Sequence, residues 1–393
     1  LGLDGLALAL VLLTSLVCTM AVVASWTVEN HLRGYLVLIL LLQTGVIGAF
    51  LALDLFLFYV FYELMLLPMY FLIGVWGGGR RKYAAAKFVV YTLGGSVCLL
   101  AAIVALYSVD VRDFVPQEFV RGRADAKQLA EPGLSDADAL RRADVHTLDA
   151  ATLSRVGQAV MLVLNGHEDR IAVQATPGQA TPGDGSDRVP LFAPGVDRTA
   201  ALARLKAEPV CSRAFQYAVF ALLFVGFAVK VPVVPLHSWL PDAHVEAPTP
   251  VSMILAGVLL KLGGYGLIRF AYPLAPWAAA ELTWWVGLVG VAGIVWGALA
   301  ALGQTDFKRL LAYSSVSHMG YVLLGLAAWS AGRSEYWEWG VVGAVFQMVA
   351  HGVTAAALFF VVGVVYDRAH HRDLLRLGGL LGPSQSFTTN PDP

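Results

Sequence analysis

Long apolar stretches alternate with short polar segments along most of this 393-residue chain. A run of about 20 apolar residues is long enough to cross the hydrocarbon core of a bilayer as a helix. The pattern predicts an all-α polytopic membrane protein with nine membrane helices, at residues 3–25, 35–53, 55–75, 83–107, 214–236, 249–271, 282–303, 310–331 and 340–366.

The apolar pattern is interrupted between residues 108 and 213, where Ala, Asp, Arg, Gly and Pro dominate. We predict an extramembrane insertion here, partly ordered at best, with a linker at PGQATPGDGSD. Within it we expect a short helix at 135–153 and a β-hairpin formed by Val160–Leu164 and Arg170–Ala175. The simplest interpretation of the insertion is a tolerated surface loop without a function of its own.

The chain therefore divides into four segments. Residues 1–107 hold four membrane helices, 108–213 the insertion, 214–376 five membrane helices with a basic tail, and 377–393 a polar end. Basic loops favour the inner side of a membrane. GGGRRK, QTDFKR and DRAHHRDLLR agree with one alternating topology, which places the insertion on the outer side, periplasmic or intermembrane.

Composition agrees with a membrane protein and argues against other classes. Charged residues make up 14% of the chain, against about 25% in soluble domains. The net charge of −1 gives no reason to expect a nucleic-acid partner. The three cysteines, Cys18, Cys98 and Cys211, have no metal or redox spacing and are interpreted as packed thiols.

The stretch Val229–Gly264 carries charges where a membrane protein rarely tolerates them. Lys230 and Lys261 both lie inside apolar runs, and an ammonium at membrane depth costs at least a few kcal/mol. Pro232 and Pro235 follow the first lysine and should break its helix, which exposes backbone groups that lipid cannot satisfy. The combination indicates a charged path through the membrane.

Glu63 is the acidic residue within the span 55–75, shortly before a predicted kink at Pro68. We interpret it as a proton-binding carboxyl whose partner is Lys230 or Lys261. The alternatives are a carboxyl that is protonated or paired with a hydroxyl for packing, and a Lys230 side chain that extends toward a helix end.

Two histidines lie in polar patches inside predicted spans, His318 in SSVSHMG and His351 in QMVAHGVTA. A lone histidine on an apolar helix is often a packed core residue, but serines, glutamine and threonine here can hold water between titrating groups. We predict that both histidines belong to a proton relay. His237 and His244, in PLHSWLPDAH, are weaker candidates that cap broken helices or line an inlet funnel.

Several long motifs resemble one family of membrane subunits. They include DLFLFYVFYELMLLPMYFLIGVWGG, VKVPVVPLHSWLPDAHVEAPTPVSMILAGVLLKLGGYGLIRF, QTDFKRLLAYSSVSHMGYVLLG and HGVTAAALFFVVGVVYDRAHHRDLLRLGGL. At residues 1–110 and 212–382 the chain is similar to the chain M (mitochondrial chain 4) family of NADH–quinone oxidoreductase, respiratory complex I.

The resemblance implies an antiporter-like helix bundle with inverted repeats and a broken helix. By position, Glu63 and Lys230 match the family's glutamate–lysine pair, Lys261 its central lysine, and His318 and His351 the histidines that follow. The chain departs from the family in its insertion, and it stops before the second broken helix. We therefore expect a bundle incomplete at both ends, through a fragment, a truncation or a frameshift.

The resemblance also implies a function. A proton-translocating subunit would move H⁺ through the Glu/Lys/His relay, coupled to quinone reduction elsewhere in the complex. This chain would bind no cofactor, with NAD, FMN, iron–sulfur clusters and quinone held by other subunits. Its partners would be other membrane subunits, the lipid bilayer and protons, and its location the bacterial inner membrane. The alternatives are a subunit of a multi-subunit cation/proton antiporter and a truncated, non-functional product.

Overall fold

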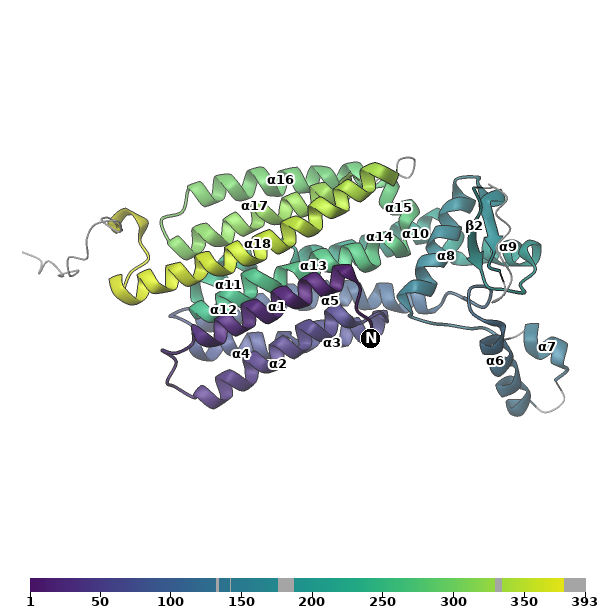
Figure 1. Ribbon diagram of the computed structural model, residues 1–393, viewed down its shortest axis with the longest axis horizontal. Coiled ribbons are helices and arrows are strands. Elements are labelled where there is room, and N and C mark those ends of the chain that lie inside the picture. The colour runs from purple at the N-terminus through teal and green to yellow at the C-terminus, as the bar shows by residue number, and fades with distance from the viewer. Residues whose placement is uncertain (132–133, 142, 176–186, 329–333, 378–393) are drawn as a thin grey trace, which may run out of the picture.

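The computed structural model describes residues 1–131, 134–141, 143–175, 187–328 and 334–377. Among these residues, nine helices are long and apolar enough to cross a membrane. They run side by side in one elongated bundle, and a smaller unit of short helices and two strands lies at one end (Figure 1). The polar end predicted at 377–393 lies outside the described residues except for Leu377.

The four membrane helices predicted before the insertion are all present. Asp4 and Asp54 begin two of them by accepting hydrogen bonds from backbone amides at the free helix starts. The third span is interrupted between Leu64 and Leu66, close to the kink predicted from Pro68. The helices are α1 (Gly5–Val23), α2 (Leu32–Leu51), α3 (Leu55–Leu64), α4 (Leu66–Trp76) and α5 (Arg81–Tyr107).

The five later spans are also present, and the predicted break after Lys230 is confirmed. The elements are α10 (Arg213–Lys230), α11 (Trp239–Glu246), α12 (Thr249–Ile254), η3 (Leu255–Leu259), α13 (Leu260–Gly266), η4 (Leu267–Ala271), α14 (Tyr272–Leu274), α15 (Pro276–Glu281), α16 (Thr283–Leu302), α17 (Phe307–Ala327), α18 (Ser334–Ala369) and η5 (Leu374–Arg376). The elements from Thr249 to Leu274 form one continuous span, in which η3 and η4 are π-helical turns.

The segment after the break differs from the loop-like inlet expected there. Residues Trp239–Glu246 form the helix α11, which buries Trp239, Leu240 and His244. Pro241 does not prevent this because it lies in the first turn, where backbone amides have no partner within the helix.

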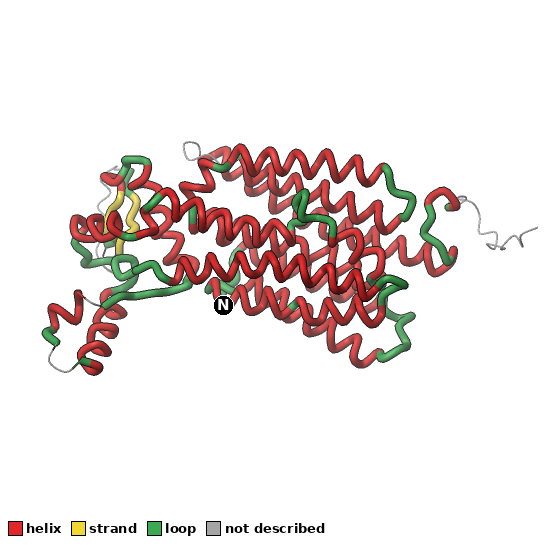
Figure 2. Tube along the Cα trace, turned by 180° about the vertical axis from the view of Figure 1, so that it is seen from behind, coloured by secondary structure: helices red, strands yellow, loops and turns green. Residues whose placement is uncertain are grey.

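The polar loops meet at the two ends of the bundle as the alternating topology requires. At one end, Gly78 N donates to Glu246 O at 2.8 Å, and Phe307 N donates to Arg372 O at 3.0 Å. Arg372 Nη1 also donates to Val245 O at 2.7 Å, which joins the two pairs. Four segments predicted on the inner side are therefore close together, and we call this the inner end. The chain's first residue and the insertion lie at the opposite end, the outer end (Figure 2).

The insertion is more ordered than the sequence suggested, and its predicted β-hairpin is wrong. Val160–Leu164 belongs to a helix, and Ile171 pairs in parallel with Val189. A short apolar run fits a strand or a buried helix equally well, and burial of α8 decided for the helix. The helix expected at 135–153 is present only in part. The elements are α6 (Gln117–Ala130), α7 (Asp136–Arg141), α8 (Ala150–Leu164), η1 (Glu168–Arg170), β1 (Ile171–Val173), β2 (Val189–Phe192), α9 (Arg198–Ala207) and η2 (Pro209–Cys211).

The insertion is attached to the outer end of the bundle by backbone contacts. Leu55 N, at the start of α3, donates to Leu148 O at 2.9 Å, and Ala150 N donates to Leu53 O at 2.9 Å. Gly157 of α8 lies so close to α14 that a Cβ atom there would sit 2.7 Å from the carbonyl oxygen of Pro273. The insertion thus contacts both the helix of Glu63 and the span of Lys261.

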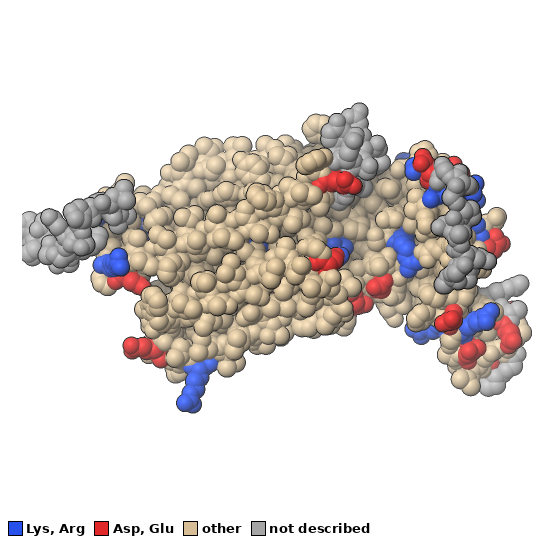
Figure 3. Space-filling model, in the orientation of Figure 1, with Lys and Arg blue, Asp and Glu red and all other residues tan. Residues whose placement is uncertain are grey.

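The face of the bundle shown in Figure 3 carries few charged side chains, whereas charges gather at both ends and on the insertion. Large apolar side chains such as Trp284, Leu299 and Phe346 are exposed on the outside. An apolar exterior around the middle of the bundle is what contact with lipid tails requires. The chain is an integral multi-pass membrane protein.

Candidate functional site

Lys261 lies at the centre of the bundle with no solvent exposure. It is the second residue after the π-helical turn η3, and its Nζ donates a hydrogen bond back to the carbonyl oxygen of Ala256, the second residue of that turn. A buried ammonium needs acceptors to replace water. The π-helical turn allows one of its own carbonyls to serve as that acceptor.

His351 of α18 is the second contact of Lys261, with Nδ1 at 2.8 Å from Nζ. On its other side, His351 Nε2 lies 3.1 Å from Ser315 Oγ of α17. When Lys261 is charged it donates to Nδ1, so the ring carries its own hydrogen on Nε2 and donates it to the serine. Both ring nitrogens are therefore engaged, and a proton can pass directly between lysine and histidine.

His318 extends this cluster toward the outside of the described bundle. Its ring stacks on that of His351 with centroids 5.1 Å apart, and Gln347 Nε2 donates to its Nδ1 at 2.9 Å. Unlike His351, the His318 side chain is exposed. The group Lys261, His351, Ser315 and His318, which we call the central cluster, thus runs from the core to the surface of α17 and α18.

Lys230 is the last residue of α10 and is 3% exposed. The negative end of a helix dipole favours a cation at this place. Its Nζ donates to the carbonyl oxygen of Tyr62 at 3.0 Å and lies 3.0 Å from the centre of the Tyr62 ring. Trp239 Nε1 donates to Val229 O at 2.9 Å, which satisfies one of the carbonyls left free where α10 ends.

Glu63 follows Tyr62, the residue that Lys230 contacts, directly in the sequence. The Glu63 carboxylate accepts a hydrogen bond from Ser96 Oγ of α5. Among the ion pairs between described residues, none joins Glu63 to Lys230. The structure brings the two side chains to neighbouring positions around Tyr62 without direct contact.

The two lysine-bearing helices pack tightly against each other. Gly263, two residues after Lys261, faces Val231, the residue after Lys230, and a Cβ atom at Gly263 would lie 2.8 Å from Val231 N. Only a glycine permits this approach. The contact places the broken end of α10 directly against the span of Lys261.

Sequence analysis missed a group of charged contacts at the inner end. Asp242 of α11 accepts from Lys87 Nζ at 2.7 Å and from Arg309 Nη2 at 3.1 Å. Lys308, assigned to a basic loop, is 4% exposed and donates to Ala247 O at 2.7 Å. The sequence carried no signal for the burial of Lys308, which depends on how the start of α17 packs against Ala247.

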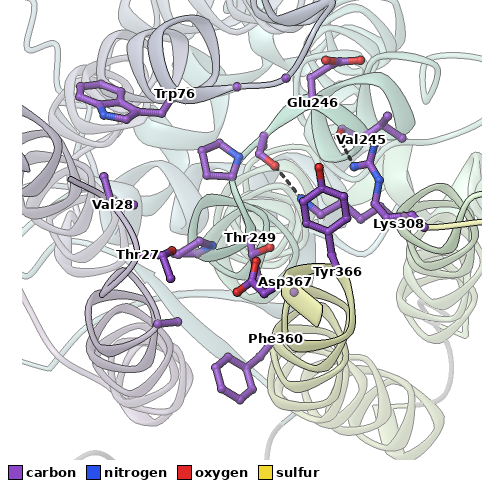
Figure 4. Close-up of a pocket in the computed structure, with 18 of the residues that line it drawn as sticks. Thr27, Val28, Trp76, Val245, Glu246, Thr249, Lys308, Phe360, Tyr366 and Asp367 are labelled. Carbon is purple, nitrogen blue, oxygen red and sulfur yellow. Dashed lines mark hydrogen bonds between the residues drawn. The ribbon is translucent and has the colours of Figure 1, made fainter. Parts of the chain in front are cut away.

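A cavity of about 400 Å³ opens at the inner end, beside Lys308. Figure 4 shows its polar walls, formed by Glu246, Thr249, Tyr366 and Asp367, and a dashed line for the hydrogen bond of Lys308. The central cluster consists of one amine, two imidazoles and one hydroxyl. The amine and the imidazoles bind protons, and the hydroxyl can relay them. Within the described ranges, no group of three or more His, Cys, Asp and Glu residues is arranged to hold a metal ion.

Comparison with known proteins identifies the family. The family described as "NADH:quinone oxidoreductase/Mrp antiporter, TM" matches residues 52–115 and 201–386. The chain belongs to this family. The unmatched residues between these two ranges fall inside the insertion, and the two lysines, the two histidines and Glu63 all fall inside the matched ranges.

Curated members of this antiporter family are similar over most of the chain. NADH-quinone oxidoreductase subunit M of Rhodobacter capsulatus is 37% identical over 387 residues, which is 98% of this chain and 60% of the relative. NAD(P)H-quinone oxidoreductase chain 4 of a Synechococcus strain is 36% identical over 380 residues, 97% of this chain and 54% of the relative. The chain thus spans about three fifths or less of the length of these relatives.

Solved structures share the antiporter-like fold. Respiratory complex I from Thermus thermophilus contains a chain with a TM-score of 0.62 and 26% identity, covering 95% of this chain and 59% of that one. The Mrp complex from Dietzia sp. contains one with a TM-score of 0.64 and 22% identity, covering 97% of this chain and 54% of that one. At 22% identity, the similarity to the Mrp complex chain shows a shared fold and nothing more.

Proposed function

We propose that this chain is a proton-translocating membrane subunit of NADH–quinone oxidoreductase. The observation that carries the proposal is the contact of 2.8 Å between Lys261 Nζ and His351 Nδ1 in a fully buried position. A buried amine bonded to an imidazole is a pair between which a proton can move without water. The family membership and the similarity to subunit M support the oxidoreductase as its setting.

In the proposed mechanism, a proton reaches Lys261 from the inner end. The ammonium donates it to His351 Nδ1, and the resulting imidazolium releases the Nε2 proton toward Ser315. His318, whose ring stacks on that of His351, is the next proton-binding group toward the surface. Glu63 and Lys230 control this transfer through their charges. A carboxylate beside the Tyr62 contact stabilises the Lys230 ammonium, and a displaced Glu63 withdraws that support.

The same proposal covers the chain's surroundings. We place the protein in a bacterial inner membrane with residues 108–213 as an extramembrane insertion on the periplasmic side. Other membrane subunits cover parts of the bundle, and NAD, FMN, iron–sulfur clusters and quinone reside in those other subunits. The redox reaction drives the relay electrostatically, so the chain needs no redox centre of its own.

A second candidate is a subunit of a multi-subunit cation/proton antiporter, which the likeness in fold to the Mrp complex favours. Affinity purification of the tagged chain from mildly solubilised source membranes separates the two. The proposal predicts co-purified NADH–quinone reductase activity and FMN. An assembly without redox activity that exchanges Na⁺ for H⁺ in vesicles supports the antiporter, and a chain with no partner and no transport supports a truncated product.

A further inference from the structure

Lys308 is a buried cation without a counter-ion among the described residues. Its side chain is 4% exposed, and its amine donates to the carbonyl oxygen of Ala247 at 2.7 Å. None of the ion pairs between described residues includes it. An ammonium carries three hydrogens, so two remain for other acceptors. Because a buried charge is costly unless it is paired, we expect an anion beside Lys308.

The cavity at the inner end, which we call the inner cavity, provides the space for this anion. Figure 4 shows Lys308 at the cavity together with Tyr366 and Asp367 of α18, and Arg372 also lines it. The volume of about 400 Å³ falls in the range of about 300–1,000 Å³ that is usual for ligand pockets. No ion pair between described residues includes Asp367. The inner cavity therefore presents an unpaired cation and an unpaired carboxylate.

An apolar groove of about 260 Å³ lies beside the inner cavity, between α1, α12 and α18, and every residue that lines it is apolar. Phe360 lines both spaces. On α1, Val23 lines the groove and Ala24 the cavity; on α12, Met253 lines the groove and Pro250, one turn earlier, the cavity. The groove thus continues from the inner cavity toward the middle of the spans. A polar space joined to an apolar groove fits an amphiphile.

Aromatic side chains mark the level of the lipid headgroups. Trp26, Trp76 and Tyr366 all line the inner cavity, and Trp26 and Tyr366 are exposed. Tryptophan and tyrosine gather where a membrane meets water, because their rings are apolar and their tips polar. The inner cavity therefore lies at the depth of the headgroups of the inner leaflet, and the groove lies at the depth of the acyl chains.

We propose that the inner cavity and the groove together bind one phosphatidylethanolamine molecule. Its phosphate accepts hydrogen bonds from the Lys308 amine, its ammonium donates to the Asp367 carboxylate, and one acyl chain lies in the groove. A phosphatidylglycerol headgroup has no cation for Asp367, and a choline headgroup has no N–H group to donate. The binding does not depend on proton transport, so the inference stands apart from the proposed function.

The test uses the tagged chain, purified with its partners in mild detergent and reconstituted in phosphatidylcholine vesicles. The vesicles contain a trace of phosphatidylethanolamine with a photoreactive diazirine on one acyl chain. After illumination, labelled peptides are identified by mass spectrometry, and labelling is normalised to the amount of assembled complex.

Two variants disable the two halves of the site. Ala357→Trp fills the groove from an exposed position, and Lys308→Gln removes the charge while keeping a donor for Ala247. The matched controls are Ala101→Trp, an exposed alanine of α5 that does not line the groove, and Lys82→Gln, an exposed lysine at the inner end.

We expect label on the peptides of α1, α12 and α18 that line the groove. A hydrogen bond to a charged group is worth about a factor of ten or more in affinity, so Lys308→Gln should lower this labelling about tenfold. Ala357→Trp should lower it at least as much, and both controls should label like the wild type. A diazirine analogue of phosphatidylglycerol should label the wild type less than the phosphatidylethanolamine analogue, and Asp367→Asn should remove that difference.

Wild-type labelling in either assembled variant overturns the inference. Absence of label from the groove peptides also overturns it, which is the result expected if a helix of another subunit fills the groove. Equal labelling of the wild type by the two lipids refutes the assignment to phosphatidylethanolamine. If Lys308→Gln does not assemble, Ala357→Trp decides alone, because its side chain lies on the outside of the bundle.

Discussion

Asp242 joins three helices at the inner end, and its neutralisation is a stringent test of the structure. The carboxylate is 15% exposed and contacts Lys87 of α5 at 2.7 Å and Arg309 of α17 at 3.1 Å. The variant Asp242→Asn preserves the shape and removes the charge, which leaves two cations without their carboxylate. Breaking a fully buried pair costs about 3–5 kcal/mol.

Partial exposure reduces this cost, because the side chains of Lys87 and Arg309 are 19% and 37% exposed and can be hydrated. We therefore expect Asp242→Asn to lower the free energy of unfolding by about 2–3 kcal/mol. The measurement is reversible denaturation by SDS in mixed micelles. Glu29→Gln is the matched control, since Glu29 is an exposed acid near the same end.

A double-mutant cycle isolates the contact between Asp242 and Lys87. Lys87→Met removes the amine while keeping an apolar side chain of similar length, and the double variant Lys87→Met/Asp242→Asn lacks both charges. We expect a coupling energy of about 1–2 kcal/mol. Additivity within about 0.3–0.5 kcal/mol, the value for independent sites, would show that the two side chains do not interact and would refute the reasoning.

Two further predictions concern the insertion. Gly157→Val should destabilise the protein by about 1–3 kcal/mol through overpacking, because its Cβ would meet the carbonyl oxygens of Pro273 and Leu274 at 2.7 and 2.9 Å. Limited proteolysis should then cut the insertion of this variant faster than that of the wild type. It should also cut it faster than in the control Gly122→Ala, where nothing lies within 4 Å of the added Cβ. Burial raises the pKa of the Glu208 carboxyl above its unfolded value of 4.5, so the contribution of Glu208 to stability is present below pH 4.5 and is lost as pH rises through the folded pKa. Glu208→Gln should therefore flatten the pH dependence of the insertion's unfolding free energy between those two pKa values. An unchanged pH dependence would contradict this.

The sequence predicted the membrane helices well because hydrocarbon imposes a length and an apolar composition on each of them. It also located the break after Lys230, since Pro232 and Pro235 cannot continue a helix. In both cases the cause acts within a few residues of the chain.

The features that sequence reasoning missed depend on contacts between distant segments. The π-helical turn before Lys261 has no residue signature, because it arises from how the span packs against its neighbours. The parallel pairing of Ile171 with Val189 required knowledge of how the insertion closes. The sequence could not give the direction of the Lys230 side chain, whose amine donates to the Tyr62 carbonyl, so its pairing with Glu63 stays a prediction.

The central claim is that Lys261 carries the transported proton, and one variant tests it directly. In membrane vesicles, Lys261→Ala is compared with wild type and with Lys82→Ala, an exposed lysine at the inner end. The account predicts that NADH-driven proton transport is lost in Lys261→Ala while the complex assembles as in wild type, and that Lys82→Ala transports normally. Normal transport by an assembled Lys261→Ala variant would contradict the account.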